Sequence, residues 1–228
     1  MNQKMMMMRP SEAVSSDEAE LAELRKLALQ GEGIQLEFKR RATHPEKIVR
    51  EMIAFANTHG GTVLIGVDDD GSIPGLKYPE EEWIGIHDAL NRCRPNILYH
   101  DTLLALPDNR FIIRIDIPES ERRPHLYSVD EETEETFVRV RDMSIKASAE
   151  MQEIIRRSKK KKDMRFTYGD HENMLMKYLA EKETITLPQF RELTGLNRFK
   201  ASRKLILLVL ADVLTITATE KGDMYARV

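Results

Sequence analysis

The sequence predicts a protein of the α/β (α+β) class in two parts: a mixed sheet with packed helices, then a small unit of three helices and a hairpin. Three observations support this prediction. Helix and strand patterns follow one another irregularly up to Arg157, which favours a mixed sheet over a regular βαβ repeat. Seven of the ten residues from Arg156 to Arg165 are Lys or Arg, as in a solvated linker. Three capped helix patterns and two strand patterns follow.

Composition and charge limit the classes of protein to consider. The 228 residues suffice for two domains, and 41% hydrophobic with 32% charged residues is typical of folded chains rather than fibrous or disordered ones. The net charge is only -3, so a nucleic-acid partner would need positive charge concentrated on part of the surface. The single cysteine, Cys93, excludes an intrachain disulfide and a cysteine-based metal site. A reducing, cytoplasmic location fits best.

No apolar run is long enough for a signal peptide or a membrane span, since the longest extends only from Leu205 to Ala211. We expect no membrane partner. We divide the chain into a disordered tail (1–15), a first domain (16–157), a basic linker (158–167) and a second domain (168–228).

The first half of the first domain contains two helix and two strand patterns. Ser16–Gln30 carries an N-terminal Ser cap and regularly spaced leucines, and Ile34–Lys39 alternates as a strand does. A helix with an apolar stripe begins at Pro45 and ends at Gly60 and Gly61. Thr62–Val67 is typical of a buried strand, and an Asp-Gly turn follows it.

The second half continues with a helix over Glu80–Cys93 and a hairpin formed by Leu103–Leu106 and Phe111–Ile117. The polar segment Glu119–Glu135 is expected to be a loop. Thr136–Arg141 is predicted as a strand, and Ser148 as the cap of a helix that closes the domain at Arg157.

The second domain contains helices at Asp170–Lys182, at Thr186–Leu193 and from Asn197 to Ala211, and then a hairpin of Val213–Thr219 and Met224–Val228. This order is typical of a winged helix-turn-helix domain.

The third of these helices places basic side chains at its N-terminal end, the end that meets base edges in helix-turn-helix proteins. The predicted nucleic-acid contacts of this domain are Arg198, Lys200, Arg203 and Lys204 on the helix and Lys221 in the wing. DNA binding is the favoured interpretation. Winged helices also serve as protein-interaction or dimerisation modules, and this alternative stays open.

A set of short motifs recurs through the first domain in one order and spacing. The set comprises Gly31-Glu32, Leu36-Glu37-Phe38-Lys39, Ala54 to Thr58, Gly60-Gly61, Ile65 to Asp68, Pro74-Gly75-Leu76, Arg123-Pro124-His125 and Phe137-Val138-Arg139. Together these residues resemble the Schlafen AlbA-like domain, also described as a divergent AAA family, over roughly Leu21–Arg157. Arg141 departs from the pattern, which has a glycine there.

The resemblance implies a nucleic-acid-binding fold, found in bacterial transcriptional regulators. Some Schlafen proteins also have a metal-dependent ribonuclease centre made of acidic residues. The resemblance implies that the corresponding acids in this chain are Glu32, Glu37 and Asp68. The residues themselves make such a centre plausible, because oxygen ligands suit Mg²⁺ or Mn²⁺, which activate water for phosphodiester hydrolysis. Lys39 would stabilise the phosphorane. In the alternative interpretation, Glu37 and Lys39 form a surface ion pair and Asp68 only accepts hydrogen bonds in its turn.

Other features of the sequence receive plainer interpretations. The basic residues Lys39, Arg40, Arg41 and Arg139 are predicted as further nucleic-acid contacts. The Gly60-Gly61 pair is not accompanied by a P-loop motif, so nucleotide hydrolysis is not expected. The six histidines are scattered without the spacing of a zinc site, and Trp83 is expected in the core.

Our first hypothesis is a DNA-binding transcriptional regulator, with a homodimer possible and no cofactor needed. The alternative is a metal-dependent endoribonuclease or nuclease acting on structured RNA, with Mg²⁺ or Mn²⁺ held by Glu32, Glu37 and Asp68. A third hypothesis is an interaction module in a defence or signalling system.

Overall fold

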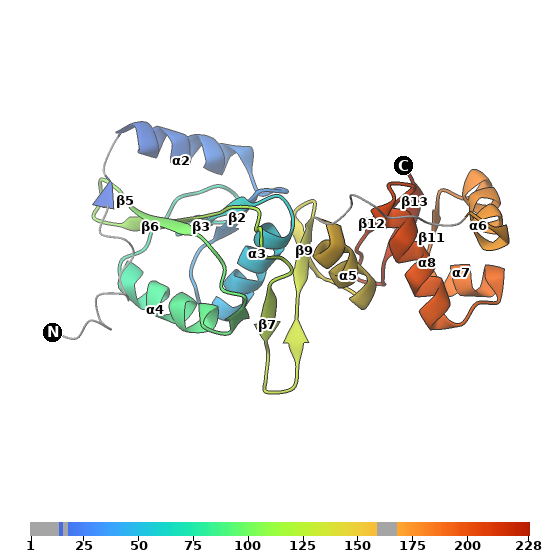
Figure 1. Ribbon diagram of the computed structural model, residues 1–228. Coiled ribbons are helices and arrows are strands. Elements are labelled where there is room, and N and C mark those ends of the chain that lie inside the picture. The colour runs from blue at the N-terminus through green and yellow to red at the C-terminus, as the bar shows by residue number, and fades with distance from the viewer. Residues whose placement is uncertain (1–13, 16–17, 159–167) are drawn as a thin grey trace. The chain divides into compact units, whose positions relative to one another are not determined.

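A computed structural model of the chain describes residues 14–15, 18–158 and 168–228 (Figure 1). It divides into two compact units, one ending at Ser144 and the other beginning at Ile145, and each is described by itself. The predicted basic linker, apart from Ser158, lies outside the described residues, as does the predicted tail apart from Val14 and Ser15. These two residues form a short strand rather than part of a disordered tail.

The first unit is built on a five-stranded mixed sheet. Its strands are β1 (Val14–Ser15), β2 (Leu36–Lys39), β3 (Gly61–Ile65), β5 (His100–Ala105) and β6 (Phe111–Ile117), in the order β1-β5-β6-β3-β2. The pairs β2/β3 and β1/β5 are parallel, whereas β3/β6 and β5/β6 are antiparallel. The predicted mixed sheet with packed helices is confirmed.

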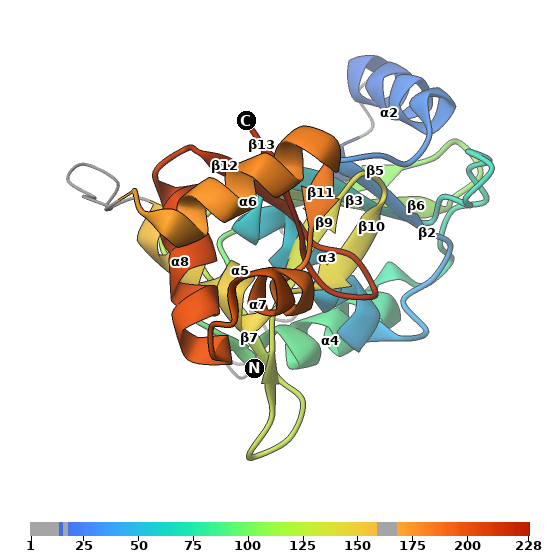
Figure 2. The same cartoon turned by 90° about the vertical axis from the view of Figure 1, so that its right-hand side faces the viewer.

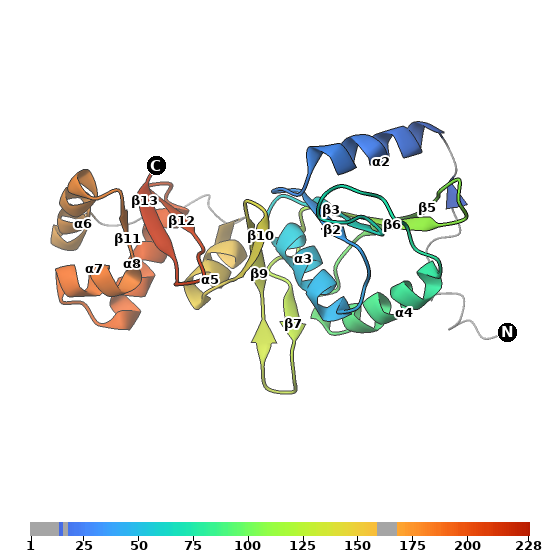
Figure 3. The ribbon, with the colours of Figure 1, turned by 180° about the vertical axis from the view of Figure 1, so that it is seen from behind.

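Helices cover both faces of this sheet (Figures 1 and 3). On one face α2 (Glu18–Gln30) packs Leu24 against Phe38 and Ile112. On the other face lie α3 (Pro45–Asn57) and α4 (Pro79–Leu90) over a larger core, which includes Met52, Trp83, Val63 and Ile115. Because side chains alternate along a strand, the face of β2 opposite Phe38 carries Glu37 and Lys39 toward α3.

Gly60 ends the α3 region for a steric reason. It has a positive φ of 70°, and a Cβ atom there would lie 2.7 Å from the carbonyl oxygen of Ile117. Only glycine fits between α3 and the end of β6.

A small three-stranded sheet was not predicted. It consists of β4 (Cys93–Arg94), β7 (Leu126–Ser128) and β8 (Glu134–Glu135), so the predicted loop over 119–135 is partly wrong. The buried Asn57 side chain holds this region: its Nδ2 donates to Thr136 Oγ1 (2.8 Å) and Phe137 O (3.0 Å), and its Oδ1 accepts from His125 N (2.8 Å). A polar segment thus gains strands through hydrogen bonds to a distant helix end.

The strand β9 (Phe137–Val140) packs against α3 and is followed by a turn at Arg141 and by β10 (Met143–Lys146). Arg141 has a φ of 58°, in the left-handed region that glycine adopts without steric cost. This conformation suits the glycine that the resemblance led us to expect at this position.

The second unit contains helices α5 (Ala149–Arg157), α6 (Asp170–Glu181), α7 (Leu187–Thr194) and α8 (Arg198–Leu210), and strands β11 (Thr184–Ile185), β12 (Leu214–Thr217) and β13 (Met224–Arg227) (Figure 2). The strands form an antiparallel sheet in the order β11-β13-β12. Ser148, Thr186 and Asn197 cap α5, α7 and α8 by accepting hydrogen bonds from the third backbone amide of each helix.

Helix α5 belongs to a different unit from the one we expected. We predicted it to close the first domain, but Ile154 joins the core formed by Leu175, Leu205 and Leu208 in the second unit. Its amphipathic face therefore finds its apolar partner in α8. Among the helices of the described segments, none has the length and apolar character that a membrane crossing needs.

Candidate nucleic-acid interface

An acid–base cluster lies between β2, α3 and β9 of the first unit; we define it as Glu32, Glu37, Lys39, Glu51 and Arg139. Arg139 Nη2 is 2.7 Å from Glu37 Oε2, and Arg139 Nη1 is 2.7 Å from Glu51 Oε2. Lys39 bonds the other carboxylate oxygen of Glu37 and lies 4.0 Å from Glu32. Three acids thus share two cations within one cluster.

Arg139 is fully engaged by this cluster. Its guanidinium also donates to the carbonyl oxygens of Gly33 (2.8 Å) and Leu36 (3.3 Å) and lies 4.9 Å from the ring centre of Phe55. Only 4% of its surface is exposed. The prediction that Arg139 contacts nucleic acid therefore does not match its place in the structure, where it anchors β9 to β2 and α3.

Burial shapes the electrostatics of the cluster. Desolvation, together with the neighbouring Glu37 carboxylate, raises the pKa of Glu51, although bonds from Ser144 and Arg139 oppose the shift. Desolvation also raises the pKa of Glu32, against the hydrogen bond from the Phe38 amide (2.8 Å). Desolvation is thus the largest cause of the raised pKa of both Glu32 and Glu51.

The predicted metal ligands do not converge. Asp68 pairs with Arg40, whose Nη1 lies 3.6 Å from Asp68 Oδ2. Glu32 and Glu37 instead pair with Lys39. Across residues 14–15, 18–158 and 168–228, no three His, Cys, Asp or Glu side chains are placed to hold one ion. The side chains present therefore do not fit the divalent ion that the resemblance implied.

The N-terminal end of α8 presents a second charged surface. Arg198, Lys200 and Arg203 are exposed, and within the described segments none of them has an acidic partner at salt-bridge distance. Lys204 differs, because it bonds the buried carboxylate of Glu172 on α6. Burial alone would raise the pKa of Glu172, but the bonds from Lys204 and backbone amides lower it. Lys204 is thus a structural link between helices.

Two further side chains belong to this surface, and one of them, Phe199, was not predicted. Lys221 is exposed in the turn between β12 and β13, as predicted for the wing. Phe199, between Arg198 and Lys200, leaves 74% of its surface exposed. An aromatic side chain beside three unpaired cations suits contact with bases, and it could have been noticed from its place among the helix's basic residues.

Comparison with known families identifies the first unit. The model of the family described as Schlafen, AlbA_2 matches residues 32–148, about half of the chain. The chain belongs to this family. Its membership indicates a nucleic-acid-related function. No functionally curated protein has a significant sequence match to the chain.

Among solved structures, the chain is similar to the DIP2311 protein from Corynebacterium diphtheriae, at 15% identity and a TM-score of 0.42. The match covers 92% of this chain and 38% of that one, so the chain spans well under half the length of that protein.

The AlbA_2 domain also contains a basic groove, which we define by Arg40, Arg41, Lys77, Tyr78 and Arg110. These residues line a cavity of about 490 Å³ together with Glu81 and Glu82. Arg40 and Arg41 belong to the predicted contacts, and although each pairs with an acid, their side chains remain 70% and 65% exposed. Lys77, Arg110 and the exposed Tyr78 were missed, since no charge run in the sequence marks them.

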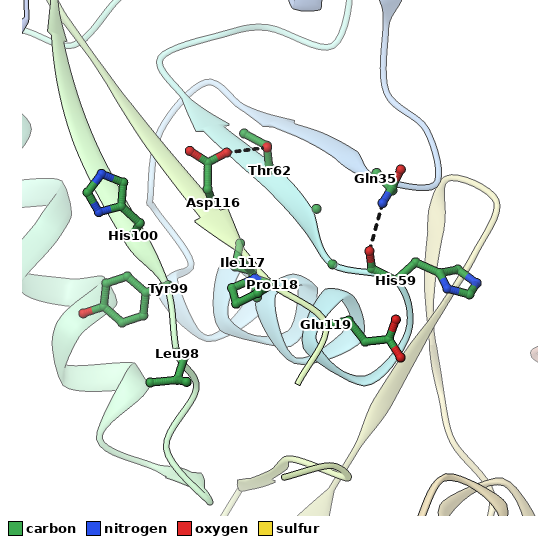
Figure 4. A pocket seen from close by; sticks show the side chains of 12 residues that line it. Gln35, His59, Thr62, Leu98, Tyr99, His100, Asp116, Ile117, Pro118 and Glu119 are labelled. Atoms are coloured by element: carbon green, nitrogen blue, oxygen red, sulfur yellow. Dashed lines mark hydrogen bonds between the residues drawn. The ribbon is translucent and has the colours of Figure 1, made fainter. Parts of the chain in front are cut away.

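A shallow hollow beside the double glycine of the AlbA_2 domain measures about 640 Å³ (Figure 4). Thr62 Oγ1 donates to Asp116 Oδ1 (2.6 Å) and Gln35 Nε2 to His59 O (2.9 Å) along its wall. Asp116 and Glu119 both line it, and their carboxylates would repel a phosphate. The hollow gives no support to phosphate binding at Gly60 and Gly61.

Proposed function

We propose that this chain is a DNA-binding transcriptional regulator and that its second unit is a winged helix-turn-helix domain. In this proposal the N-terminal end of α8 enters the major groove, and Lys221 in the β12–β13 turn contacts a neighbouring phosphate. Gly195, with a φ of 68°, makes the turn between α7 and α8.

One observation carries the proposal: Arg198, Lys200 and Arg203 are exposed and unpaired among the described residues, although the chain as a whole is acidic. Elsewhere many basic side chains lie beside acids, as Arg41 does at Glu82, Arg114 at Glu23 and Lys204 at Glu172. Unpaired cations at one helix end supply the local positive charge that binding to a polyanion requires.

The AlbA_2 domain supplies a second nucleic-acid surface in this proposal. The basic groove is lined by four cations, of which Arg40, Arg41 and Arg110 each lie beside an acid but stay largely exposed, and Tyr78 offers an exposed ring for stacking. This role agrees with the nucleic-acid-related function of the family. A contact between two copies of the chain is the other role that we propose for this domain.

The test measures the affinity of the full chain for mixed-sequence duplex DNA at 50 and 200 mM salt. The double variant Arg198→Ala/Arg203→Ala is expected to bind at least about tenfold more weakly, because phosphate and base contacts are lost together. The matched control is Lys177→Ala/Lys182→Ala, which removes two exposed cations from the α6 region and should bind as the wild type does. Equal binding by the first variant and the wild type would refute the proposal.

The nuclease alternative has less support. It requires Glu32, Glu37 and Asp68 to share one ion, whereas Glu37 already bonds Arg139 and Lys39, and Asp68 faces Arg40. Each of these carboxylates is paired with a cation of the chain: Glu32 and Glu37 with Lys39, Glu37 also with Arg139, and Asp68 with Arg40.

A further inference from the structure

A separate cavity of about 390 Å³ lies within the second unit. The N-terminal ends of α5, α7 and α8 and the β12–β13 turn all contribute to its wall. Its volume falls within the range of about 300–1,000 Å³ that ligand pockets occupy. The proposed function assigns no role to the cavity itself, although two of its lining residues, Arg198 and Lys221, are proposed DNA contacts.

Its most buried wall is polar. Tyr225 has no exposed surface, and among the described residues its hydroxyl finds no hydrogen-bond partner. Glu150, beside it, is also buried. A buried hydroxyl without a partner is unfavourable, so a bound molecule that supplied the partner would gain affinity from this contact.

Asp223 completes the inner wall. It accepts a hydrogen bond from Ser148 Oγ and lines the cavity with Glu150. The pKa of Asp223 is raised, chiefly by burial. The hydrogen bond from Ser148 opposes this shift, and the neighbouring Glu150 carboxylate adds to it. Within the described segments neither carboxylate has a cation at salt-bridge distance, which favours a positively charged group at this end.

The outer wall has the opposite charge. Arg191, Arg198 and Lys221 line it, all three are exposed, and in the described part of the chain none has an ion-pair partner. Leu187 and Pro188 lie in the same wall and offer apolar contact. The cavity is thus acidic at its buried end and basic at its open end.

We propose that this cavity binds a small zwitterionic molecule of the amino-acid class. Its ammonium group lies between Asp223 and Glu150 and donates to the Tyr225 hydroxyl, and its carboxylate lies against Arg191, Arg198 and Lys221. Both ends are then paired with opposite charge, and the free hydroxyl gains a partner.

The site has a consequence that rests on the proposed function. Arg198 and Lys221 line the cavity and are also proposed DNA contacts. A carboxylate bound to them competes with DNA phosphate, so the bound molecule weakens DNA binding and acts as an effector.

The experiment is isothermal titration calorimetry on the full chain, because the binding itself does not depend on DNA. The probes are the twenty amino acids and the ω-amino acids from β-alanine to 6-aminohexanoate, in which the two charges move apart stepwise. Butylamine and butyrate serve as single-charge controls. Saturable binding is expected for zwitterions whose charge separation matches the cavity and not for either control.

Two variants locate the binding. Asp223→Asn keeps an acceptor for Ser148 but removes the charge, and it should weaken binding by about tenfold or more. Tyr225→Phe removes only the hydroxyl, so it should lose affinity while the unliganded protein stays at least as stable. Glu220→Gln, an exposed acid in the same turn, is the matched control and should bind normally.

No saturable binding by any probe, or equal binding by Asp223→Asn and the wild type, overturns the proposal. The DNA arm is scored separately: the bound zwitterion should lower the DNA affinity of the wild type and leave that of Asp223→Asn unchanged. If the chain fails to bind DNA, the calorimetry still decides the site.

Discussion

The guanidinium of Arg139 lies 2.7 Å from the carboxylate of Glu37, in the interior of the AlbA_2 domain and 102 positions away in sequence. The same guanidinium holds Glu51 of α3, so one side chain joins β2, α3 and β9. Two motifs that suggested nucleic-acid contact and metal binding are thus partners in a structural cluster. The pair therefore bears both on the stability of the domain and on the nuclease hypothesis.

Replacing Arg139 by Ala should strongly destabilise the protein. The change leaves the buried Glu37 carboxylate and the partly buried Glu51 carboxylate beside each other without their shared cation, and breaking a buried ion pair costs about 3–5 kcal/mol. Urea unfolding monitored by circular dichroism measures the loss. Arg25→Ala, on the exposed side of α2, should change stability by no more than about 0.5 kcal/mol. Similar stability of the two variants would show that Arg139 is not a structural anchor.

Glu37 should not be a catalytic acid. Because its carboxylate is occupied by Arg139 and Lys39, we expect no cleavage of transfer RNA or single-stranded DNA in the presence of Mn²⁺ or Mg²⁺ beyond that of Glu37→Gln. Gel electrophoresis of the incubated nucleic acids measures this. Cleavage by the wild type that is absent in a folded Glu37→Gln variant would restore the nuclease hypothesis.

The sequence was sufficient to predict the elements that depend on residues close to one another in the chain. The apolar stripe of α3, the hairpin of β5 and β6 and the caps Ser148, Thr186 and Asn197 all depend on residues within a few positions of one another. The chain's membership of the AlbA_2 family also follows from motifs that are contiguous in sequence.

What could not be predicted depends on partners far apart in the chain. Arg139 meets Glu37 only once β9 has packed against α3, and Lys204 meets Glu172 across 32 positions. From the sequence both Arg139 and Lys204 were expected to be free cations, because the acid that pairs with each lies far away in the chain. The strands β7 and β8 were missed for the same reason, since Asn57 holds that region from 68 or more positions away.

The stability of the domain should fall as the pH rises above about 4.5, in part because of Glu51. Burial and the Glu37 carboxylate raise the pKa of Glu51 above 4.5 in the folded chain. Between that value and the folded pKa the folded state binds more protons than the unfolded state, so the free energy of unfolding decreases with pH. Glu51→Gln should make this decrease shallower in urea titrations from pH 4.5 to 7.5. Glu80→Gln, an exposed control, should follow the wild type, and a Glu51→Gln curve parallel to the wild type would contradict the assignment.

Phe199 should contribute to DNA affinity without contributing to its salt dependence. Its exposed ring lies beside Arg198 and Lys200 and can make apolar contact with thymine methyl groups. Phe199→Ala is expected to weaken binding by about 1 kcal/mol, at the low end of the effect of a single base-pair contact. Fluorescence anisotropy across a salt series measures both quantities. The control is Met174→Ala on α6, and a changed salt slope would argue against base contact.

Arg141→Gly should stabilise the protein, because the turn after β9 needs a backbone conformation that arginine adopts at a cost. Its φ of 58° lies in the left-handed region, which costs an L-residue about 1–2 kcal/mol. Glycine avoids this cost but loses more conformational entropy on folding than arginine does. The free energy of unfolding, measured with urea, is therefore expected to rise by up to about 1 kcal/mol. Arg141→Ala removes the same side chain and keeps the strain, so it should show no gain. If the alanine variant were as stable as the glycine variant, the strain would lie elsewhere than in the backbone of residue 141.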